Sequence, residues 1–190
     1  MRWRHIEAHR VHHGGKLTSV TTASSTKSYT YDSAGRTTSV TTSAGTTSLS
    51  YDYEDRIVQI SYPGGGTNTF TYNGLDTRVG KTDSSGTKSY RRDGVDVTSP
   101  VLNDSSASYT PEISQRAGGV STFQHTGLQN ADFQSNSSQS GTAARTYDAF
   151  GNVISSSGTW AGPFGYNGNA GYQEDPDSGL KLFGHTGNTT

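Results

Sequence analysis

The sequence contains no cysteine, few charged residues and no long apolar run. Without cysteine, neither a disulfide framework nor a thiolate metal site can form. Charged residues make up 16% of the 190 residues and the formal net charge is −1, so the chain lacks the basic surface typical of nucleic-acid-binding proteins. Because no stretch of about 18 apolar residues occurs, we expect no membrane span. The sequence therefore argues against a disulfide-stabilised protein, a thiolate metalloprotein, a nucleic-acid-binding protein and a protein with a membrane-spanning helix.

Hydrophobic residues are also scarce, at 28% of the chain, so a conventional core would be thin. Low hydrophobicity favours disorder, and a flexible linker rich in Ser, Gly and Thr is the first alternative. However, low charge removes the repulsion that expands disordered chains. Thr and Tyr favour strands, while Gly and Asn favour turns. We therefore predict an all-β protein in which glycine occupies the turns.

The first fifteen residues differ in composition from the rest. They are basic and rich in histidine, with no apolar stretch, so we do not expect a secretory signal there. The histidines at positions 5, 9, 12 and 13 (His5, His9, His12 and His13) could bind a metal ion, because His9 and His13 would share one face if the segment were helical. No cysteine or evident carboxylate accompanies them, so we predict a solvated terminus, no metal site and no cofactor. The expected segments are residues 1–15, a repeat array at 16–143 and a distinct region at 144–190.

A Tyr-Asp unit recurs along the chain, at residues 31–36 (YDSAGR), 51–56 (YDYEDR) and 147–152 (YDAFGN), with a looser copy at 72–76 (YNGLD). The first three tyrosines are 51 − 31 = 20 and 72 − 51 = 21 residues apart, which is room for one β-hairpin per repeat. Such a unit can bury itself against its neighbours. The repeat-defining residues are Tyr31, Asp32, Gly35, Arg36, Tyr51, Asp52, Arg56, Tyr72, Tyr147, Asp148 and Gly151.

Each residue type has a physical role in this unit. Asp before a turn accepts main-chain N–H groups, and Gly35 takes a positive φ. The following Arg or Asn can reach a carboxylate of the adjacent repeat. Tyrosines at one-repeat spacing can form a ladder of rings across the strands. A row of Tyr/Asp sites for sugars or cations is the alternative to this structural role.

The remaining chain gives a coarser prediction. We expect turns at 43–45, 63–66 and 83–86, and a short hairpin at Asp93-Gly94. Strands are predicted at 109–115 and 120–125, with a loop or short helix at 129–133.

The Tyr-Asp units resemble the YD repeats of bacterial RHS (rearrangement hotspot) proteins, which are related to the repeats of insecticidal toxin complexes and of teneurins. The resemblance extends over about residues 16–185. Residues 163–166 (PFGY) and 171–180 (GYQEDPDSGL) are similar to the RHS-associated core, in which a D-P-x-x-G-L turn, here with Asp175, Pro176 and Gly179, precedes the end of the shell. The resemblance implies antiparallel hairpins in a curved or spiralling sheet, part of a hollow β-shell that in full-length relatives encloses a toxin.

The chain departs from that family pattern after Gly184-His185. Relatives continue into a second Asp-Pro element and a Gly-Arg-Phe segment, whereas residues 186–190 (TGNTT) follow here. The self-cleavage by paired aspartates that the family implies is therefore not carried over to Asp175 and Asp177. We expect a truncated core-like segment with no catalytic residue.

Three functional hypotheses follow from these observations. The first is a non-enzymatic β-repeat scaffold, extracellular or at the cell surface, acting within the rest of an RHS shell or joining copies of itself through open sheet edges into a filament or tube. The second is a carbohydrate or cell-surface binding module that recognises glycans through exposed aromatic residues. The third is the remnant of a toxin-encapsulating, self-cleaving core.

Overall fold

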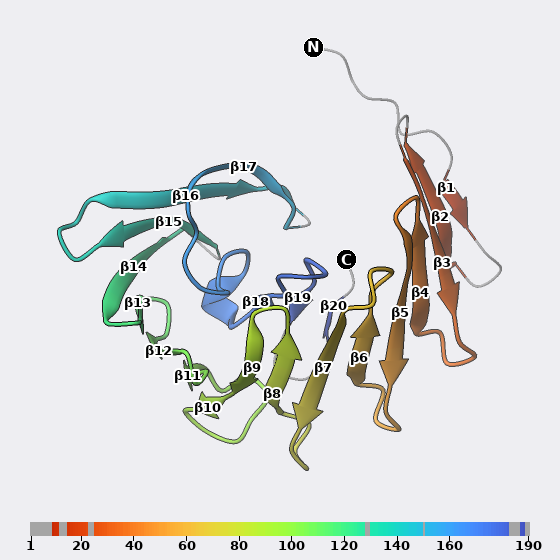
Figure 1. The fold of residues 1–190 in the computed structure, drawn as a ribbon, viewed down its shortest axis with the longest axis horizontal. Coiled ribbons are helices and arrows are strands. Elements are labelled where there is room, and N and C mark those ends of the chain that lie inside the picture. Colours follow the sequence, from red (N-terminus) through yellow and green to blue (C-terminus); the bar gives the residue numbers. More distant parts are fainter. Residues whose placement is uncertain are drawn as a thin grey trace. The chain divides into compact units, whose positions relative to one another are not determined.

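The computed structural model describes residues 9–11, 15–22, 25–127, 130–149, 151–182 and 187–188, with β1 and β20 described by their backbone alone. The chain divides into two compact units, Met1–Thr69 and Phe70–Thr190. Antiparallel strands and one 3-10 turn make up the regular structure of the described residues (Figure 1). The all-β prediction is therefore confirmed.

The first unit consists of strands that follow one another in sequence order (Figure 1). Each strand pairs antiparallel with the next. The strands are β1 (His9–Val11), β2 (Leu17–Thr22), β3 (Ser25–Tyr31), β4 (Thr37–Thr42), β5 (Gly45–Tyr51), β6 (Ile57–Ser61) and β7 (Thr67–Tyr72), the last of which crosses the boundary between the units.

The two faces of this sheet differ sharply in composition. One cross-strand row consists of hydroxyl residues in direct register from β3 to β7: Thr30, Ser39, Ser48, Ser61 and Thr67. Most of this face is exposed. The opposite face carries the buried residues Leu49, Ile60 and Asn68. Alternation of apolar and hydroxyl residues along each strand, together with the β propensity of Thr, fixes which side is buried.

The second unit contains a hairpin, an eight-stranded sheet (β10 to β17, in sequence order) and a three-stranded sheet. Its elements are β8 (Arg78–Asp83), β9 (Gly86–Ser89), β10 (Arg91–Arg92), β11 (Val101–Asn103), β12 (Ala107–Thr110), β13 (Ser114–Ala117), β14 (Val120–Thr126), β15 (Ala131–Asn136), β16 (Gly141–Tyr147), β17 (Val153–Gly158), the 3-10 turn η1 (Gly168–Ala170), β18 (Gln173–Glu174), β19 (Lys181–Leu182) and β20 (Gly187–Asn188).

The core of the second unit is small and relies on polar contacts. Val101, Ala107 and Tyr109 form a buried cluster, against which Tyr90 and Phe164 pack. The segment that carries Phe164 is held to β15, because fully buried Gln134 donates to the Ala161 carbonyl at 2.7 Å and accepts from the Ala161 N–H at 2.9 Å. Such paired amide bonds compensate for the scarcity of apolar residues.

The structure corrects three sequence expectations in this unit. The strand predicted at 109–115 is broken after Thr110, because Pro111 starts a turn closed by the Ile113 N–H on the Thr110 carbonyl. The loop or helix predicted at 129–133 is wrong over its described part, where β15 begins at Ala131. A hairpin does form at Asp93-Gly94, since β10 pairs antiparallel with β11, but its connection is not short: it runs to Pro100, whose carbonyl accepts the Asp93 N–H at 3.0 Å. The expected turns at 43–45, 63–66 and 83–86 lie where predicted.

Candidate functional site

The loop that follows the first Tyr-Asp pair is organised by the Asp32 carboxylate. Its Oδ1 accepts the Arg36 N–H at 2.9 Å, and its Oδ2 accepts the Arg36 Nε–H at 2.6 Å. The main chain adds two bonds, from the Asp32 N–H to the Arg36 carbonyl and from the Gly35 N–H to the Asp32 carbonyl, both 3.0 Å. Gly35 has φ +91°, as the turn requires. One aspartate therefore fixes the five-residue loop.

The same loop recurs at the other sequence repeats. Asp52 accepts the Arg56 N–H at 3.0 Å and its Nε–H at 2.7 Å. Asp148 accepts the Asn152 N–H at 2.9 Å and its side-chain amide at 2.8 Å. The loose copy at 73–77 uses an asparagine, whose Oδ1 accepts the Thr77 N–H at 3.0 Å. Asp or Asn at the first loop position thus accepts the main-chain N–H of the fifth residue in every copy, whereas the side chain of the fifth residue bonds to it where that residue is Arg or Asn, not in the copy with Thr77.

Gly151 carries a double constraint within its loop. Its φ is +85°, and a Cβ at this position would lie 2.7 Å from the Tyr166 ring. The Tyr166 hydroxyl donates to the Ala149 carbonyl at 2.9 Å, which keeps the ring over the loop. Tyr147, just before the loop, lies 5.8 Å from the Tyr166 ring, and burial raises the pKa of Tyr147. Glycine is needed here for both backbone and space.

Sequence reasoning missed further copies of the loop. Residues 62–66 and 136–140 make the same pair of main-chain bonds without a Tyr-Asp pair, and Asn136 Oδ1 accepts the Ser138 and Ser140 N–H groups at 3.0 and 3.1 Å. Gly15, at φ +79°, and the following Lys16 stand 35 − 15 = 20 residues before Gly35 and Arg36. The positive φ at the fourth loop position is the shared feature, and only glycine reveals it in a sequence.

The tyrosines of the first two repeats are tied to the strand that follows the preceding loop. The Tyr31 hydroxyl donates to the Leu17 carbonyl at 2.6 Å, and the Tyr51 hydroxyl donates to the Thr37 carbonyl at 2.8 Å. Leu17 and Thr37 are the first residues of β2 and β4. Both tyrosines are half-buried and stand at a β-bulge. The tyrosines therefore set the register between successive repeats.

The basic residue of one loop contacts the next repeat, as expected from the sequence. Arg36 Nη1 lies 2.6 Å from Asp55 Oδ1, and its guanidinium lies 4.9 Å from the centre of the Tyr51 ring. Lys16 Nζ lies over the Tyr31 ring at 5.4 Å. The predicted ladder of tyrosine rings is therefore wrong. Tyr31 and Tyr51 are two strands apart, about 10 Å, so a basic side chain fills the space over each ring.

The loop carboxylates are stabilised in their ionised form. Hydrogen bonding to the Arg36 main-chain N–H, followed by its guanidinium, holds the pKa of Asp32 below its ordinary value. Burial alone would raise the pKa of Asp52, but the hydrogen bonds from Arg56 outweigh it and lower that pKa. The remaining repeat residue, Tyr72, is half-buried at the end of β7. All these features favour a structural role for the repeat residues.

The core-like turn is held by a buried aspartate. Asp175 is fully buried, and its Oδ2 accepts the Ser178 N–H at 2.9 Å and the Ser178 hydroxyl at 2.5 Å. Its main chain bonds to Leu180 and Gly179, the latter at φ +72°, while Pro176 is exposed within the turn. The turn joins β18 to β19. Asp175 thus shapes the loop in which it lies.

A buried lysine lies beside this turn. Lys81 forms an ion pair with Asp83 and lies 4.0 Å from Asp175 Oδ1, and all three side chains are almost fully buried. Burial opposes ionisation of Asp83, but bonds from Lys81 and Ser85 prevail and lower its pKa. Asp177 points elsewhere and accepts the Ser84 N–H at 2.9 Å. Asp175 and Asp177 are therefore engaged with different groups.

A second buried carboxylate organises the cluster around Tyr109. Asp104 Oδ2 accepts from Lys88 Nζ at 2.9 Å and from the Tyr109 hydroxyl at 2.8 Å, and its Oδ1 accepts the Ala107 N–H at 2.7 Å. Burial raises the pKa of Asp104, but these bonds and those from Ser106 outweigh it, so the pKa falls to about 2. Burial, then the Asp104 charge, raises the pKa of Tyr109.

The described residues contain no group of three or more His, Asp and Glu side chains arranged to hold a metal ion. His5, His12 and His13 lie outside the described residues, and β1 shows only the backbone of His9. Among the described residues, no helix is long and apolar enough to span a membrane.

Comparison with known proteins places the repeats in a family. Residues 13–47 and 31–67 match the RHS repeat. No curated protein matches the sequence.

Solved structures resemble most of the chain. A Photorhabdus luminescens Tc holotoxin pore with a TccC3 mutation is 13% identical and covers 87% of this chain, with a TM-score of 0.53. A crystal structure of TcdB2-TccC3-TEV is 13% identical and covers 85%, with a TM-score of 0.50. The chain spans 11% of the length of each. This likeness concerns the fold: hairpins similar to a Tc toxin shell. Together with the repeat match, it identifies the chain as one that carries RHS repeats over residues 13–67 within an all-β fold like that of a Tc toxin shell.

Proposed function

We propose that this chain is a non-enzymatic structural segment of an RHS-type β-shell, acting outside the cell or at its surface. The contacts between successive loops carry the proposal: the Tyr51 hydroxyl on the Thr37 carbonyl and Arg36 on Asp55. They use the repeat-defining side chains to join one repeat to the next. Side chains that make such contacts stabilise an array in which each repeat packs against its neighbours, as in other repeat scaffolds.

Removal of one whole repeat tests this modular role. Deleting residues 37–56, twenty residues, joins one loop to the strand that follows the equivalent loop. We expect a β-type circular dichroism spectrum and a cooperative melt. Deleting residues 37–46 alone removes ten residues and reverses the strand direction after the loop, so this variant serves as the disruptive control. If both deletion variants lacked a β-type spectrum and a cooperative melt, the modular scaffold would be contradicted.

The partner that best fits the structure is another β-sheet of the same kind, which belongs either to the rest of a shell or to a second copy of this chain. Strand β17 is the last in its sheet and is exposed along its whole length, with Ile154 68% exposed. An edge of this kind pairs readily with another strand. Sedimentation and negative-stain microscopy of the purified chain test association between copies; a monomer at all concentrations would exclude the filament or tube and leave the shell partner.

The other hypotheses receive less support from the geometry. A strand-face glycan site on the repeat tyrosines would need free rings and hydroxyls, whereas Tyr31 and Tyr51 are half-buried and donate to main-chain carbonyls. A self-cleaving core would need two cooperating carboxylates, whereas Asp175 lies beside Lys81 and Asp177 binds a main-chain N–H. Intact-mass measurement during storage tests the self-cleaving core, because the accumulation of fragments would support it.

A further inference from the structure

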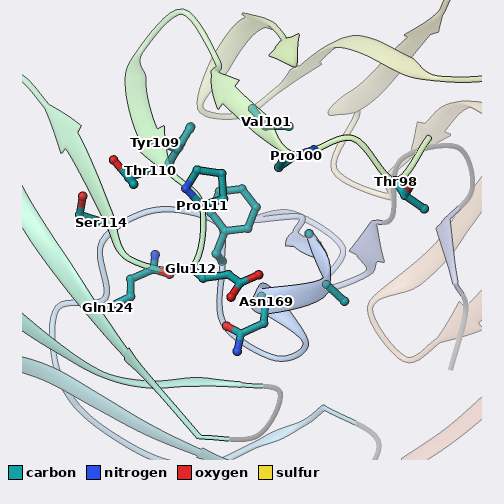
Figure 2. Close-up of a pocket in the computed structure, with 14 residues that line it drawn as sticks. Thr98, Pro100, Val101, Tyr109, Thr110, Pro111, Glu112, Ser114, Gln124 and Asn169 are labelled. Atoms are coloured by element: carbon teal, nitrogen blue, oxygen red, sulfur yellow. The ribbon is translucent and has the colours of Figure 1, made fainter. Parts of the chain in front are cut away.

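A cavity of ≈ 390 Å³ lies in the second unit, beside the turn that joins β12 to β13 (Figure 2). The start of β11, one residue of β14 and the segment around η1 form the rest of its wall. Its volume lies within the range of about 300–1,000 Å³ that is typical of small-molecule sites. None of the repeat loops contributes to its lining, so the side chains of the cavity are separate from those that join the repeats.

The lining of this cavity carries a negative charge that no basic residue compensates. Glu112 belongs to the lining, and the described lining residues include no lysine, arginine or histidine. Glu112 is exposed, and its side chain makes no hydrogen bond or ion pair within the described part of the chain. Figure 2 shows it extending from the turn toward Asn169. An uncompensated carboxylate attracts a cation and repels an anion.

The turn holds this carboxylate at an unfavourable backbone position. A main-chain bond from Ile113 closes the turn, with Pro111 and Glu112 at its centre. Glu112 has φ +65°, at a turn position where glycine is preferred. Asp55 is another acidic residue with a positive φ, and its carboxylate bonds to Arg36. Glu112 has no such partner among the described residues, so its carboxylate is available to a ligand.

A second hydrogen-bond acceptor at the cavity lacks a donor. The Oδ1 atom of Asn169 is buried and accepts no hydrogen bond from the described residues. A buried acceptor without a partner is unfavourable, so a ligand that donates to it removes that penalty. Because the free groups of Glu112 and Asn169 are both acceptors, they favour a ligand rich in donors. A primary ammonium group has three N–H donors and a positive charge, and it therefore suits both residues.

Beside these acceptors the cavity is apolar and aromatic. Val101, Tyr109 and Phe164 line it, and the rings of Tyr109 and Phe164 meet edge to face with centroids 5.1 Å apart. Tyr109 is buried and its hydroxyl donates to Asp104, which fixes the position of the ring. Such a surface packs against methylene groups, and aromatic rings also attract a cation.

The chemistry of the lining selects the ligand class. We propose that the cavity binds a primary alkylammonium ion, whose N–H groups donate to Glu112 and Asn169 while its methylene groups pack on Val101 and Phe164. An anion would be repelled by Glu112, and a neutral ligand would leave the carboxylate without a counter-charge. A quaternary ammonium has no N–H to donate to Asn169. Free amines and the side chain of lysine share this chemistry.

Titration of the full chain near neutral pH, followed by saturation-transfer NMR and calorimetry, tests the proposal. The probes are n-butylamine and cadaverine, with 1-butanol, butyrate and choline as the neutral, anionic and quaternary controls. We expect saturable millimolar binding of the primary amines and binding of each control that is at least about tenfold weaker. Absence of saturation with both amines, or equal binding of any control, would overturn the proposal.

A further probe, Nα-acetyl-lysine methylamide, distinguishes the two sources of the ammonium group. Binding as tight as that of n-butylamine would support the proposal with a lysine side chain as the ligand. Weaker binding than that of n-butylamine would support it with a free amine as the ligand.

The substitution Glu112→Gln separates binding from folding. It removes the charge but keeps the size of an exposed side chain, so we expect an unchanged melting temperature and n-butylamine binding at least about tenfold weaker. Asp93→Asn makes the same charge change at an exposed residue outside the cavity lining, and this matched control should bind as the parent does. Unchanged affinity in Glu112→Gln would refute the site, while the structural role of the repeats would stand.

Discussion

Asp104 offers the strongest test of how this chain stabilises a core with few apolar residues. The carboxylate is 1% exposed and receives bonds from Lys88, Tyr109, Ser106 and Ala107. Asp104→Ala leaves a buried tyrosine hydroxyl and a lysine without their acceptor. Loss of one partner from a buried ionic network costs about 3 kcal/mol or more. We therefore expect a large loss of stability from the substitution of one buried polar residue.

The milder substitution Asp104→Asn isolates the contribution of the charge. The pKa falls from an ordinary value of 3.8 to about 2, a difference of 3.8 − 2 = 1.8. At 1.36 kcal/mol for each pKa unit, the ionised carboxylate stabilises the folded state by about 2 kcal/mol near neutral pH. Because the folded pKa is the lower one, this stability is present above pH 4 and is lost as the pH falls toward 2.

Urea unfolding followed by circular dichroism, repeated between pH 7 and pH 2, measures both effects. Asp104→Asn should be less stable than the unaltered chain at pH 7, and the difference should shrink as the pH falls through 4. Asp93→Asn, which makes the same charge change at an exposed position of the same unit, is the control and should change little. A difference between Asp104→Asn and the parent that stays constant down to pH 2 would refute the reasoning.

Three further predictions concern the repeat loops. Tyr51→Phe removes the hydroxyl that donates to β4 and should lower the free energy of unfolding by about 1 kcal/mol in urea titrations, whereas Tyr53→Phe, at a fully exposed side chain, should leave it unchanged. A double-mutant cycle of Arg36→Ala and Asp55→Ala should give a small favourable coupling that weakens with added salt; a coupling insensitive to salt would argue against an ion pair. Gly151→Ala should lower the free energy of unfolding by about 2 kcal/mol, because it combines backbone strain with a steric clash, and a thermal midpoint equal to that of the parent would contradict this.

The sequence was most informative where local chemistry determines local structure. Asp32 and Asp52 could be assigned to turns because an aspartate before a glycine or a basic residue has few other ways to satisfy its bonds. The contact from Arg36 to the adjacent repeat was predictable from charge and spacing. The all-β class followed from Thr and Tyr enrichment. These inferences involve residues separated by about one repeat at most.

Features that depend on distant residues could not be derived in this way. The tyrosine ladder failed because the two-strand separation leaves room for a basic side chain, a fact of three-dimensional spacing. The loop at 62–66 could be predicted as a turn from its glycines but not as a copy of the repeat loop, because it lacks the Tyr-Asp pair; the loop at 136–140 lacks both that pair and a glycine. Lys81 and Asp175 are 175 − 81 = 94 residues apart, and their proximity emerges only on folding.

The contact between Arg36 and Asp55 also explains why one repeat loop has no glycine at its fourth position. The loop 52–56 carries Asp55, at φ +64°, where the loop 32–36 carries glycine. A left-handed backbone costs a residue other than glycine about 1 kcal/mol, so intrinsic preference alone favours glycine. Asp55 instead supplies the carboxylate that Arg36 of the preceding loop reaches. Asp55 therefore accepts an unfavourable backbone conformation in return for a bond between two repeats.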